Sequence, residues 1–492
     1  MKKIISLFFV VLLTLSLIAC SGGYDPSKHQ REEVKVSQDR TIAYVEDFVG
    51  LTLDQVGYDN LLGQRATKVG EGILKLVITS TDGTSIDISD EENLKNYIIA
   101  GQDLKPNTEI KFTFDDGPFP TWQSYEQMFL KVIKVGEKLS EEPQFTQINP
   151  SDDNEHYYIR DYVGLNLHDI GFTNLFKDRV DVYGESILKF IINTEDNTKI
   201  FIEEENDEEL LKDYVVVSQN IEPNSLMQVT YNVDENGKKE SIPSFSSYQE
   251  IVLNVAKIGS DNSNENIVIK PSIDNTIHYV RNYVGRNLAD CGYTNAYGEC
   301  ADEYGNGYIK LSLVCEDGKN IELDEDETYT RNYVVVAQNI SPNTELRYTL
   351  SKDGYFMSDC NYDEILLELK EIGSNDDSLL ELQEIKASPD KYTKYLPDYV
   401  GRNLSQAIKL SVFGTEIQIS NGYIDATIMD EEGHRLDITE DNIKNYVVTK
   451  QDLEPNTEIK FTYLKDSKGN EYDNLVDETS VKNICLTVKE LN

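Results

Sequence analysis

The sequence contains few of the residues from which active sites are usually built. Its 492 residues include five histidines, and these lie at scattered positions rather than at equivalent places in the repeats described below. No Cys-x-x-Cys pair is present, which argues against a thiolate zinc site, and scattered histidines argue against a histidine base. We therefore expect no catalytic residue, no bound metal and no cofactor, and a protein that is not an enzyme.

One motif of catalytic type does occur, a Ser-x-x-Lys match formed by Ser186 and Lys189. In penicillin-binding enzymes this spacing places lysine one helical turn from the nucleophilic serine. Here the match lies at the start of an expected strand, where the two side chains would not have that geometry. We interpret it as a coincidence of sequence.

Basic residues are also scarce. Lys and Arg number 46 against 88 Asp and Glu, which gives a formal charge of −42 at neutral pH. Such a chain repels polyanions, so nucleic acid and bare anionic lipid are not expected as ligands.

The N-terminal segment is the longest apolar run. It has Lys2 and Lys3, an apolar stretch from Ile4 to Ala19, and then Cys20. The stretch is too short for an ordinary membrane-spanning helix, and it is typical of an export signal. Its Leu-Ile-Ala-Cys ending resembles a bacterial lipoprotein signal, which implies a signal peptide at 1–19, lipidation of Cys20 and a tether at 20–40. The alternative is a plain cleaved signal peptide. We expect the protein to be lipid-anchored at the extracellular face of the cell membrane.

Cysteine usage leaves two alternatives open. Cys291, Cys300, Cys315 and Cys360 lie in one stretch, and in an exported chain they could form two disulfides of unknown connectivity. Alternatively, Cys291 is a buried small apolar residue, since it stands where other repeats have Val56 and Ile170.

Two sequence blocks recur four times. "NYVVVAQNISPNTEL" at 332–346 has counterparts at 96, 213 and 445, and a block of the type "YVGxNL" precedes each copy, with its glycines 114 to 121 residues apart. A period of this length favours small domains over a helical solenoid. We predict repeats at 41–136, 156–259, 277–373 and 392–492. The segments between them, 137–155, 260–276 and 374–391, are polar and are interpreted as linkers, with a short helix from Leu379.

Each repeat is predicted to be an α+β domain, a short helix packed on a mostly antiparallel sheet. Leu74, Leu76 and Ile78 alternate with other residues before an Asp-Gly pair, which favours a hairpin there. In the recurring block, proline sets the turn and the asparagine after it tolerates the left-handed conformation. Gln338 has no evident packing role, and we expect it to hydrogen-bond to nearby backbone.

The paired blocks resemble the PASTA domain, a small extracellular repeat of penicillin-binding proteins and bacterial serine/threonine kinases. The fourth copy follows the opening pattern most closely, with Pro397, Asp398, Gly401 and Leu404, and Gln338 is followed by Asn343 and Thr344 at the family's spacing. The resemblance covers both blocks in all four repeats. It implies a module of the cell envelope that binds peptidoglycan or other wall material, or acts as a spacer.

Two further features are candidate sites. Phe119, Trp122 and Tyr125 of the first repeat are expected to be exposed and could contact a ligand. Acidic clusters precede the expected helical turns at 90–92, 203–205, 324–327 and 440–441. We interpret these as helix N-termini, with Ser89 and Glu92 as a capping box, rather than as calcium ligands. The leading hypothesis is weak multivalent binding to the wall, and the alternative is a passive stalk or adhesin that presents variable loops to a protein partner.

Overall fold

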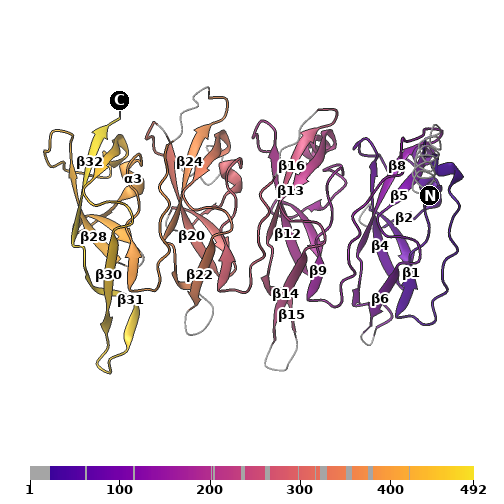
Figure 1. The fold of residues 1–492 in the computed structure, drawn as a ribbon, viewed down its shortest axis with the longest axis horizontal. Helices are drawn as coiled ribbons and strands as arrows, with labels where there is room; N and C mark the ends of the chain where they lie inside the picture. Colours follow the sequence, from indigo (N-terminus) through magenta and orange to yellow (C-terminus); the bar gives the residue numbers. More distant parts are fainter. Residues whose placement is uncertain are drawn as a thin grey trace, which may run out of the picture.

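The computed structural model describes residues 23–491 apart from 61–63, 115–116, 201, 203–204, 234–238, 261–265, 297, 316, 322–329, 351–356, 375–379 and 420–421. Cys20 and the signal-like segment therefore lie outside the described residues. Four repeats stand side by side in one row, and each points a hairpin toward the same edge of the row (Figure 1). Within the described part of the chain, no helix is long and apolar enough to cross a membrane.

Each repeat contains one five-stranded and one three-stranded sheet. In repeat 1 the larger sheet has the order β2-β3-β4-β8-β5, and the smaller has the order β1-β6-β7. The central pair β4 and β8 is parallel, and the other pairs are antiparallel. The strands of repeat 1 are β1 (Ile42–Tyr44), β2 (Tyr58–Asp59), β3 (Arg65–Val69), β4 (Gly72–Ser80), β5 (Tyr97–Gln102), β6 (Glu109–Thr113), β7 (Trp122–Gln123) and β8 (Gln127–Lys134).

The other three repeats have the same topology. The strands of repeat 2 are β9 (His156–Tyr158), β10 (Phe172–Thr173), β11 (Arg179–Tyr183), β12 (Ser186–Thr194), β13 (Tyr214–Gln219), β14 (Leu226–Val233), β15 (Lys239–Ser246) and β16 (Glu250–Lys257). Those of repeat 3 are β17 (Ile277–Tyr279), β18 (Tyr293–Thr294), β19 (Cys300–Tyr304), β20 (Gly307–Cys315), β21 (Tyr333–Gln338), β22 (Glu345–Leu350), β23 (Met357–Cys360) and β24 (Glu364–Glu371). Those of repeat 4 are β25 (Thr393–Tyr395), β26 (Lys409–Ser411), β27 (Gly414–Ile419), β28 (Gly422–Met429), β29 (Tyr446–Gln451), β30 (Glu458–Lys465), β31 (Glu471–Thr479) and β32 (Asn483–Glu490).

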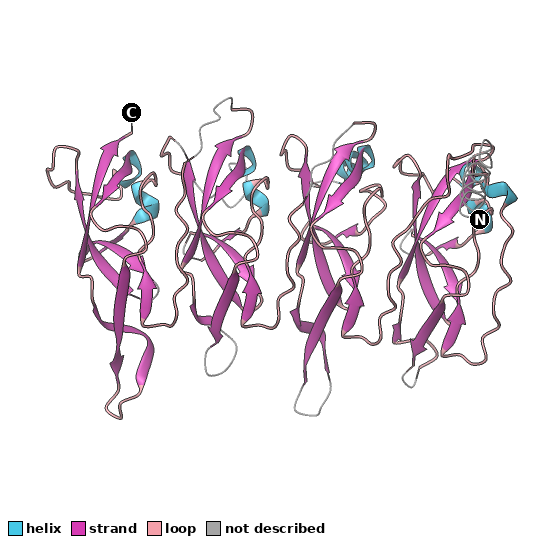
Figure 2. Cartoon of the chain, in the orientation of Figure 1, coloured by secondary structure: helices cyan, strands magenta, loops and turns pink. Residues whose placement is uncertain are grey.

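The repeats are mostly β, so the predicted α+β class is corrected to a sheet-rich one (Figure 2). The helices are short: η1 (Pro26–Lys28), η2 (Leu53–Gln55), α2 (Glu91–Leu94), η3 (Glu205–Asp213), η4 (Leu288–Asp290), η5 (Thr330–Asn332), α3 (Leu404–Ala407) and η6 (Ile443–Asn445). Gly57 shows one reason. Its φ is +77°, and a Cβ there would lie 2.6 Å from the Ala66 carbonyl oxygen, so the chain turns away where a longer helix would continue.

The expected Asp-Gly hairpin is only partly correct. The turn forms, with Gly83 at φ +83°, but the chain after it makes only an isolated bridge from Ser85 to Thr79. The true hairpin joins β3 to β4. The pattern around β4 therefore predicted the strand correctly. Its antiparallel hairpin partner, however, is the strand before it and not the segment after the Asp-Gly turn.

The linkers are fastened to the repeats rather than extended between them. Asn107, Asn224, Asn343 and Asn456 have φ of 65° to 67°, as expected for this turn. Their side-chain oxygens accept backbone N–H groups from the segments that lead into each repeat: Lys35, Asn149, Lys270 and Lys386 are the donors. The residues after Leu379 are not helical. The proposed tether is also docked, since Tyr24 pairs with Leu139 and donates its hydroxyl to the Ala100 carbonyl.

The central strands are buried on both faces in the first three repeats and on one face in the fourth. In β8 the residues from Gln127 to Val132 are buried apart from the half-buried Lys131, and Val77 and Phe129 lie in the core cluster of repeat 2. In β32 buried residues alternate with less buried ones, and the register position of Phe129 is Cys485. The outer face of repeat 4 is polar, with Thr449 and Lys450 exposed.

Candidate functional site

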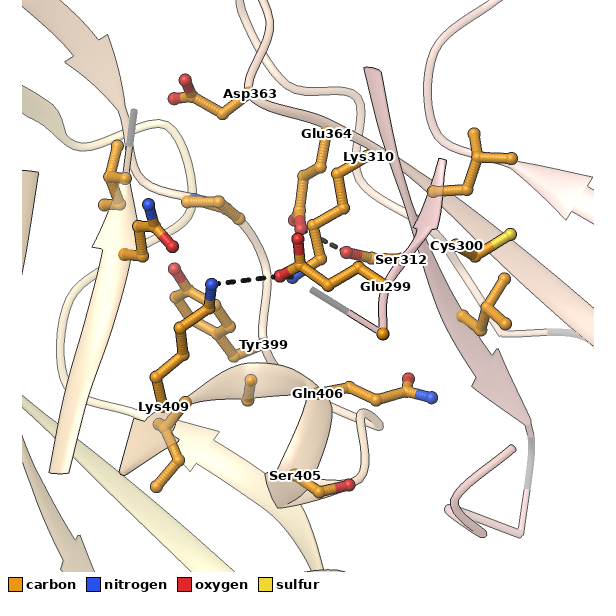
Figure 3. Close-up of a pocket in the computed structure, with 18 of the residues that line it drawn as sticks. Glu299, Cys300, Lys310, Ser312, Asp363, Glu364, Tyr399, Ser405, Gln406 and Lys409 are labelled. Atoms are coloured by element: carbon orange, nitrogen blue, oxygen red, sulfur yellow. Dashed lines mark hydrogen bonds and ion pairs between the residues drawn. The ribbon is translucent and has the colours of Figure 1, made fainter. Parts of the chain in front are cut away.

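A cavity of about 680 Å³ lies at the third junction, between repeats 3 and 4 (Figure 3). Repeat 3 contributes β20 and the segment that leads into β24, and repeat 4 contributes α3 and the end of β27. Apolar side chains at its wall include Leu311, Ile408 and Ile419. We call this space the third-junction cavity.

Charged and polar groups of both repeats meet in this cavity. The Glu299 carboxylate lies 3.2 Å from the Lys409 ammonium and 3.5 Å from that of Lys310. Burial alone would raise the pKa of Glu299, but Lys310 and Lys409 hold it below its ordinary value. The side-chain oxygen of Gln406 is buried and has no hydrogen-bond partner among the described residues.

Other contacts hold the third junction together around the cavity. The Arg402 guanidinium, buried in repeat 4, lies 2.6 Å from the Glu364 carboxylate of repeat 3. Lys394 is also fully buried, and its ammonium lies 2.7 Å from the Asp359 carboxylate and donates to the Cys360 carbonyl. The cavity is therefore a space within a docked interface, and not a gap between separate domains.

At the first junction, between repeats 1 and 2, large side chains stand at the equivalent positions. A small pocket of about 20 Å³ lies beside Arg160 and Tyr183. Arg160 occupies the position of Pro397, and its guanidinium lies 5.4 Å from the centre of the Phe129 ring and 3.8 Å from the Asp103 carboxylate. Tyr183 occupies the position of Ile419, and its hydroxyl lies 2.8 Å from that of Tyr162.

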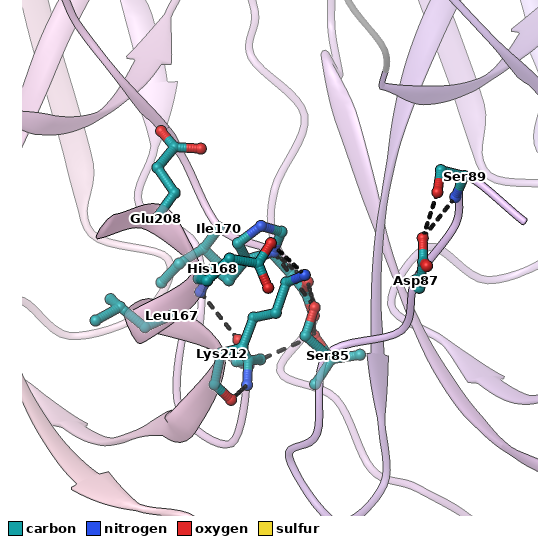
Figure 4. A network of polar contacts seen from close by, with 12 residues as sticks. Ser85, Asp87, Ser89, Leu167, His168, Ile170, Glu208 and Lys212 are labelled. Atoms are coloured by element: carbon teal, nitrogen blue, oxygen red, sulfur yellow. Dashed lines mark hydrogen bonds and ion pairs between the residues drawn. The ribbon is translucent and has the colours of Figure 1, made fainter. Parts of the chain in front are cut away.

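A second polar network crosses the first junction at the Asp-Gly turn (Figure 4). The Ser85 hydroxyl of repeat 1 points toward His168 and donates to the Asp169 carboxylate at 2.5 Å. The Asn166 amide donates to the Gly83 carbonyl at 2.8 Å. At the third junction Asn403 donates to the Gly318 carbonyl in the same way, so the turn is a docking element of the array.

The second junction, between repeats 2 and 3, resembles the first. Arg281 forms an ion pair with Asp302 of its own repeat and lies 3.5 Å from Glu250 of repeat 2. Arg286 approaches the same Glu250 carboxylate at 2.8 Å. Burial would raise the pKa of Glu250, but the two guanidinium groups hold it below its ordinary value. Tyr283 and Tyr304 complete the cluster with hydroxyls 2.7 Å apart.

The recurring glutamine is part of the framework, as predicted. The Gln338 side chain accepts the Tyr283 N–H at 2.8 Å and donates to the carbonyls of Arg281 and Ile340. Equivalent bonds are made by Gln102, Gln219 and Gln451. This side chain therefore joins the two sequence blocks of each repeat and is not a ligand contact.

The aromatic residues predicted as a contact surface are dispersed. Phe119 is 77% exposed, whereas Trp122 is half-buried in β7. Tyr125 is 6% exposed, and its hydroxyl donates to the Ile148 carbonyl of the following linker. The expected exposure is therefore wrong for Tyr125, because this ring fills the core and fixes the linker.

The four cysteines considered for disulfides are buried and form no disulfide in this structure. Cys291, Cys300, Cys315 and Cys360 each carry a thiol, and burial raises the pKa of Cys315 and Cys360 to about 12. Cys291 belongs to the core of repeat 3, so the structure corresponds to the buried-residue alternative.

The acidic cluster of repeat 1 begins a helix. The Asp90 carboxylate accepts the Glu92 N–H at the start of α2, while Ser89 donates to Asp87 instead of capping. Part of the cluster at 203–205 and the whole of the cluster at 324–327 lie outside the described residues. Among the described residues, a different group, Asp430, Glu432 and His434, has ligand atoms within 4.8 Å of one another, on an exposed turn.

Comparison with protein-family models, curated proteins and solved structures found no match for this chain. The junction residues were not identified from the sequence, although the repeats contain a signal for them. When the four copies are aligned, Pro397 occupies the same position as Arg160 and Arg281, and Ile419 occupies the same position as Tyr183 and Tyr304. Their significance depends on contacts between repeats, which the pattern within one repeat does not specify.

Proposed function

We propose that this chain is a non-catalytic stalk of the bacterial cell envelope, anchored to the membrane by a lipid on Cys20. The single observation that supports it best is the docking of successive repeats through buried ion pairs such as Arg402 with Glu364 and Arg286 with Glu250. Breaking a pair of this kind leaves a buried charge, so each junction strongly favours one geometry. A row of docked repeats holds its far end at a fixed distance from its anchor.

The stiffness of the stalk is tested by small-angle X-ray scattering of residues 21–492. The expected profile is that of one extended particle whose length does not change between low and molar salt, because buried pairs are weakly screened. A profile that requires an ensemble of bent chains would contradict the proposal. The variant Arg286→Ala should add bending, whereas Arg347→Ala, which alters an exposed pair, is the control.

The anchor is tested by Cys20→Ala. The substituted protein is expected to leave the membrane fraction and appear in the medium or in the uncleaved precursor pool. Retention of the variant in the membrane at the wild-type level would exclude lipidation as the anchor.

A second function, binding to peptidoglycan or other wall material, is favoured by the repeated hairpins. The hairpins β6–β7, β14–β15, β22–β23 and β30–β31 project from the same edge of the row (Figure 1). Weak contacts at several such points would add through their high local concentration. The resemblance of the paired blocks to the PASTA domain supports the same interpretation.

This second function is tested by co-sedimentation with purified peptidoglycan at physiological salt. Wild-type protein is expected to sediment more than an acidic control protein, and shortening each hairpin in turn should reduce retention by steps. If retention equals that of the control while trimming of "DDGPFPTW" at 115–122 removes a protein partner, the stalk presents a loop to a protein instead.

A further inference from the structure

The third-junction cavity has the size and the polar wall of a binding site for a small molecule. Its volume of about 680 Å³ lies within the roughly 300–1,000 Å³ of ordinary ligand pockets. It could hold roughly 20 water molecules at the volume of liquid water. A ligand that replaces such water gains affinity only if it reproduces the hydrogen bonds.

The charges at the wall are nearly balanced. They comprise Lys310, Lys409 and Lys444, and Glu299, Asp359, Asp363 and Glu364. Glu364 is paired with Arg402, and Asp359 with Lys394. Burial raises the pKa of Asp363 to about 6, although the Lys394 ammonium, which lies 3.5 Å from its carboxylate, opposes this. An anion would also meet the repulsion of a chain with a formal charge of −42.

Hydrogen-bonding groups remain available beside these balanced charges. The described residues provide no hydrogen-bond partner for the Tyr399 hydroxyl. The Gln406 side chain also lines the cavity, although its oxygen, which has no partner, is inaccessible to water in this structure. In repeats 2 and 3 the equivalent hydroxyls of Tyr162 and Tyr283 donate to Asp181 and Asp302. Burying such groups unsatisfied is unfavourable, so a polar partner from solution is expected to bind them.

Aromatic side chains complete the wall. Tyr308, Tyr362 and Tyr399 line the cavity, and Tyr308 is 41% exposed. Amphipathic rings of this kind can contact the C–H face of a sugar ring while polar neighbours bind its hydroxyls. From this set of groups we propose that the third-junction cavity binds an uncharged, hydroxyl-rich molecule of the size of a disaccharide. The site goes beyond the proposed stalk and does not depend on membrane anchoring.

The proposal is tested by saturation-transfer NMR and calorimetry on residues 21–492. The probes are cellobiose, maltose, trehalose and diacetylchitobiose at millimolar concentration, with glycylglycine and citrate as charged probes. At least one sugar is expected to bind. Binding of a charged probe alone, or of none of them, would overturn the proposal.

Two kinds of variant locate the site. Pro397→Arg with Ile419→Tyr introduces the side chains that fill the first two junctions, and it should weaken sugar binding by at least about tenfold. Tyr399→Phe and Gln406→Leu keep the cavity but each removes one hydrogen-bonding group, which should weaken binding about fivefold. Lys460→Ala, on the exposed part of β30, is the matched control. Wild-type affinity in both the filled and the hydrogen-bonding variants would place the sugar elsewhere and overturn the assignment.

Discussion

The first and third junctions are built on the same backbone, yet one is filled and the other is hollow. A pocket of about 20 Å³ lies at the first and a cavity of about 680 Å³ at the third. Arg160 and Tyr183 at the first are replaced by Pro397 and Ile419 at the third. Both junctions keep the bond from an asparagine amide to the carbonyl of the preceding Asp-Gly turn. The turn contact is therefore common to both junctions, whereas the side chains at the centre of the interface differ.

The largest expected effect comes from removing a buried cation at the second junction. Arg281→Ala leaves the Glu250 and Asp302 carboxylates without one of their partners, and we expect a loss of about 3–5 kcal/mol in the free energy of unfolding. Urea denaturation followed by hydrogen exchange of peptides from repeats 2 and 3 measures it. Arg347→Ala, which removes an exposed pair, should cost less than about 1 kcal/mol. Equal losses in the two variants would show that the junction pair does not hold the repeats together.

The filled first junction can be made to resemble the hollow third one. Tyr183→Ile removes a buried ring and its hydroxyl bond to Tyr162, and we expect a loss of about 2–4 kcal/mol from the lost packing and the new space. Urea denaturation measures the loss. The conservative variant Tyr183→Phe removes only the hydroxyl and should cost about 1 kcal/mol. If the two variants are equally stable, packing of the ring does not maintain the junction.

The two junctions share a buried carboxyl with a raised pKa at one position, which is Glu126 at the first and Asp363 at the third. Burial raises the pKa of Glu126 to about 7, although Arg160 opposes this. Because the folded protein keeps a proton that the unfolded chain loses near pH 4.5, stability contributed by this group falls as pH rises from about 4.5 to 7. Glu126→Gln should abolish that fall and be more stable than wild type by roughly 1–3 kcal/mol near pH 7.

Denaturation midpoints at several pH values between 4 and 8 test the titration of Glu126. Glu141→Gln, at an exposed linker position, provides the control and should follow the wild-type curve. If the difference in stability between Glu126→Gln and wild type stayed constant across this pH range, the predicted titration of Glu126 would be wrong.

The smallest expected effect lies outside the junctions. Phe119→Ser changes a side chain that is 77% exposed, so its free energy of unfolding should stay within about 0.5 kcal/mol of wild type. Any loss of wall or partner binding in this variant would then be due to the contact itself. A large loss of stability would mean that Phe119 packs against other parts of the protein.

The sequence was sufficient to predict the features that each repeat builds locally. The four repeats, the strands around Leu76 and Val335, and the left-handed asparagine after each turn proline all follow from short-range patterns. The hydrogen bonding of Gln338 to backbone was predicted because its side chain has no evident packing role in the recurring block.

The remaining features depend on contacts that no local pattern contains. Val77 and Phe129 belong to the core of the next repeat, so their hydrophobicity alone did not indicate an interface. Arg286 and Arg402 are almost completely buried, whereas an arginine in a polar-looking strand block is ordinarily assigned to the surface. The linkers had the composition of flexible segments, but their backbone N–H groups bind the asparagines of the following repeats.

The polar outer face of repeat 4 has a consequence for how the array could change in length. Repeats 2 and 3 each have one face that docks onto the preceding repeat and one that receives the next, so an internal duplication of either would still bring a docking face against a receiving face. A duplicate of repeat 4 would instead place Thr449, Lys450 and Cys485 at positions where apolar side chains are needed to pack against the added repeat. Duplication is therefore expected to be tolerated more readily at repeats 2 and 3 than at repeat 4.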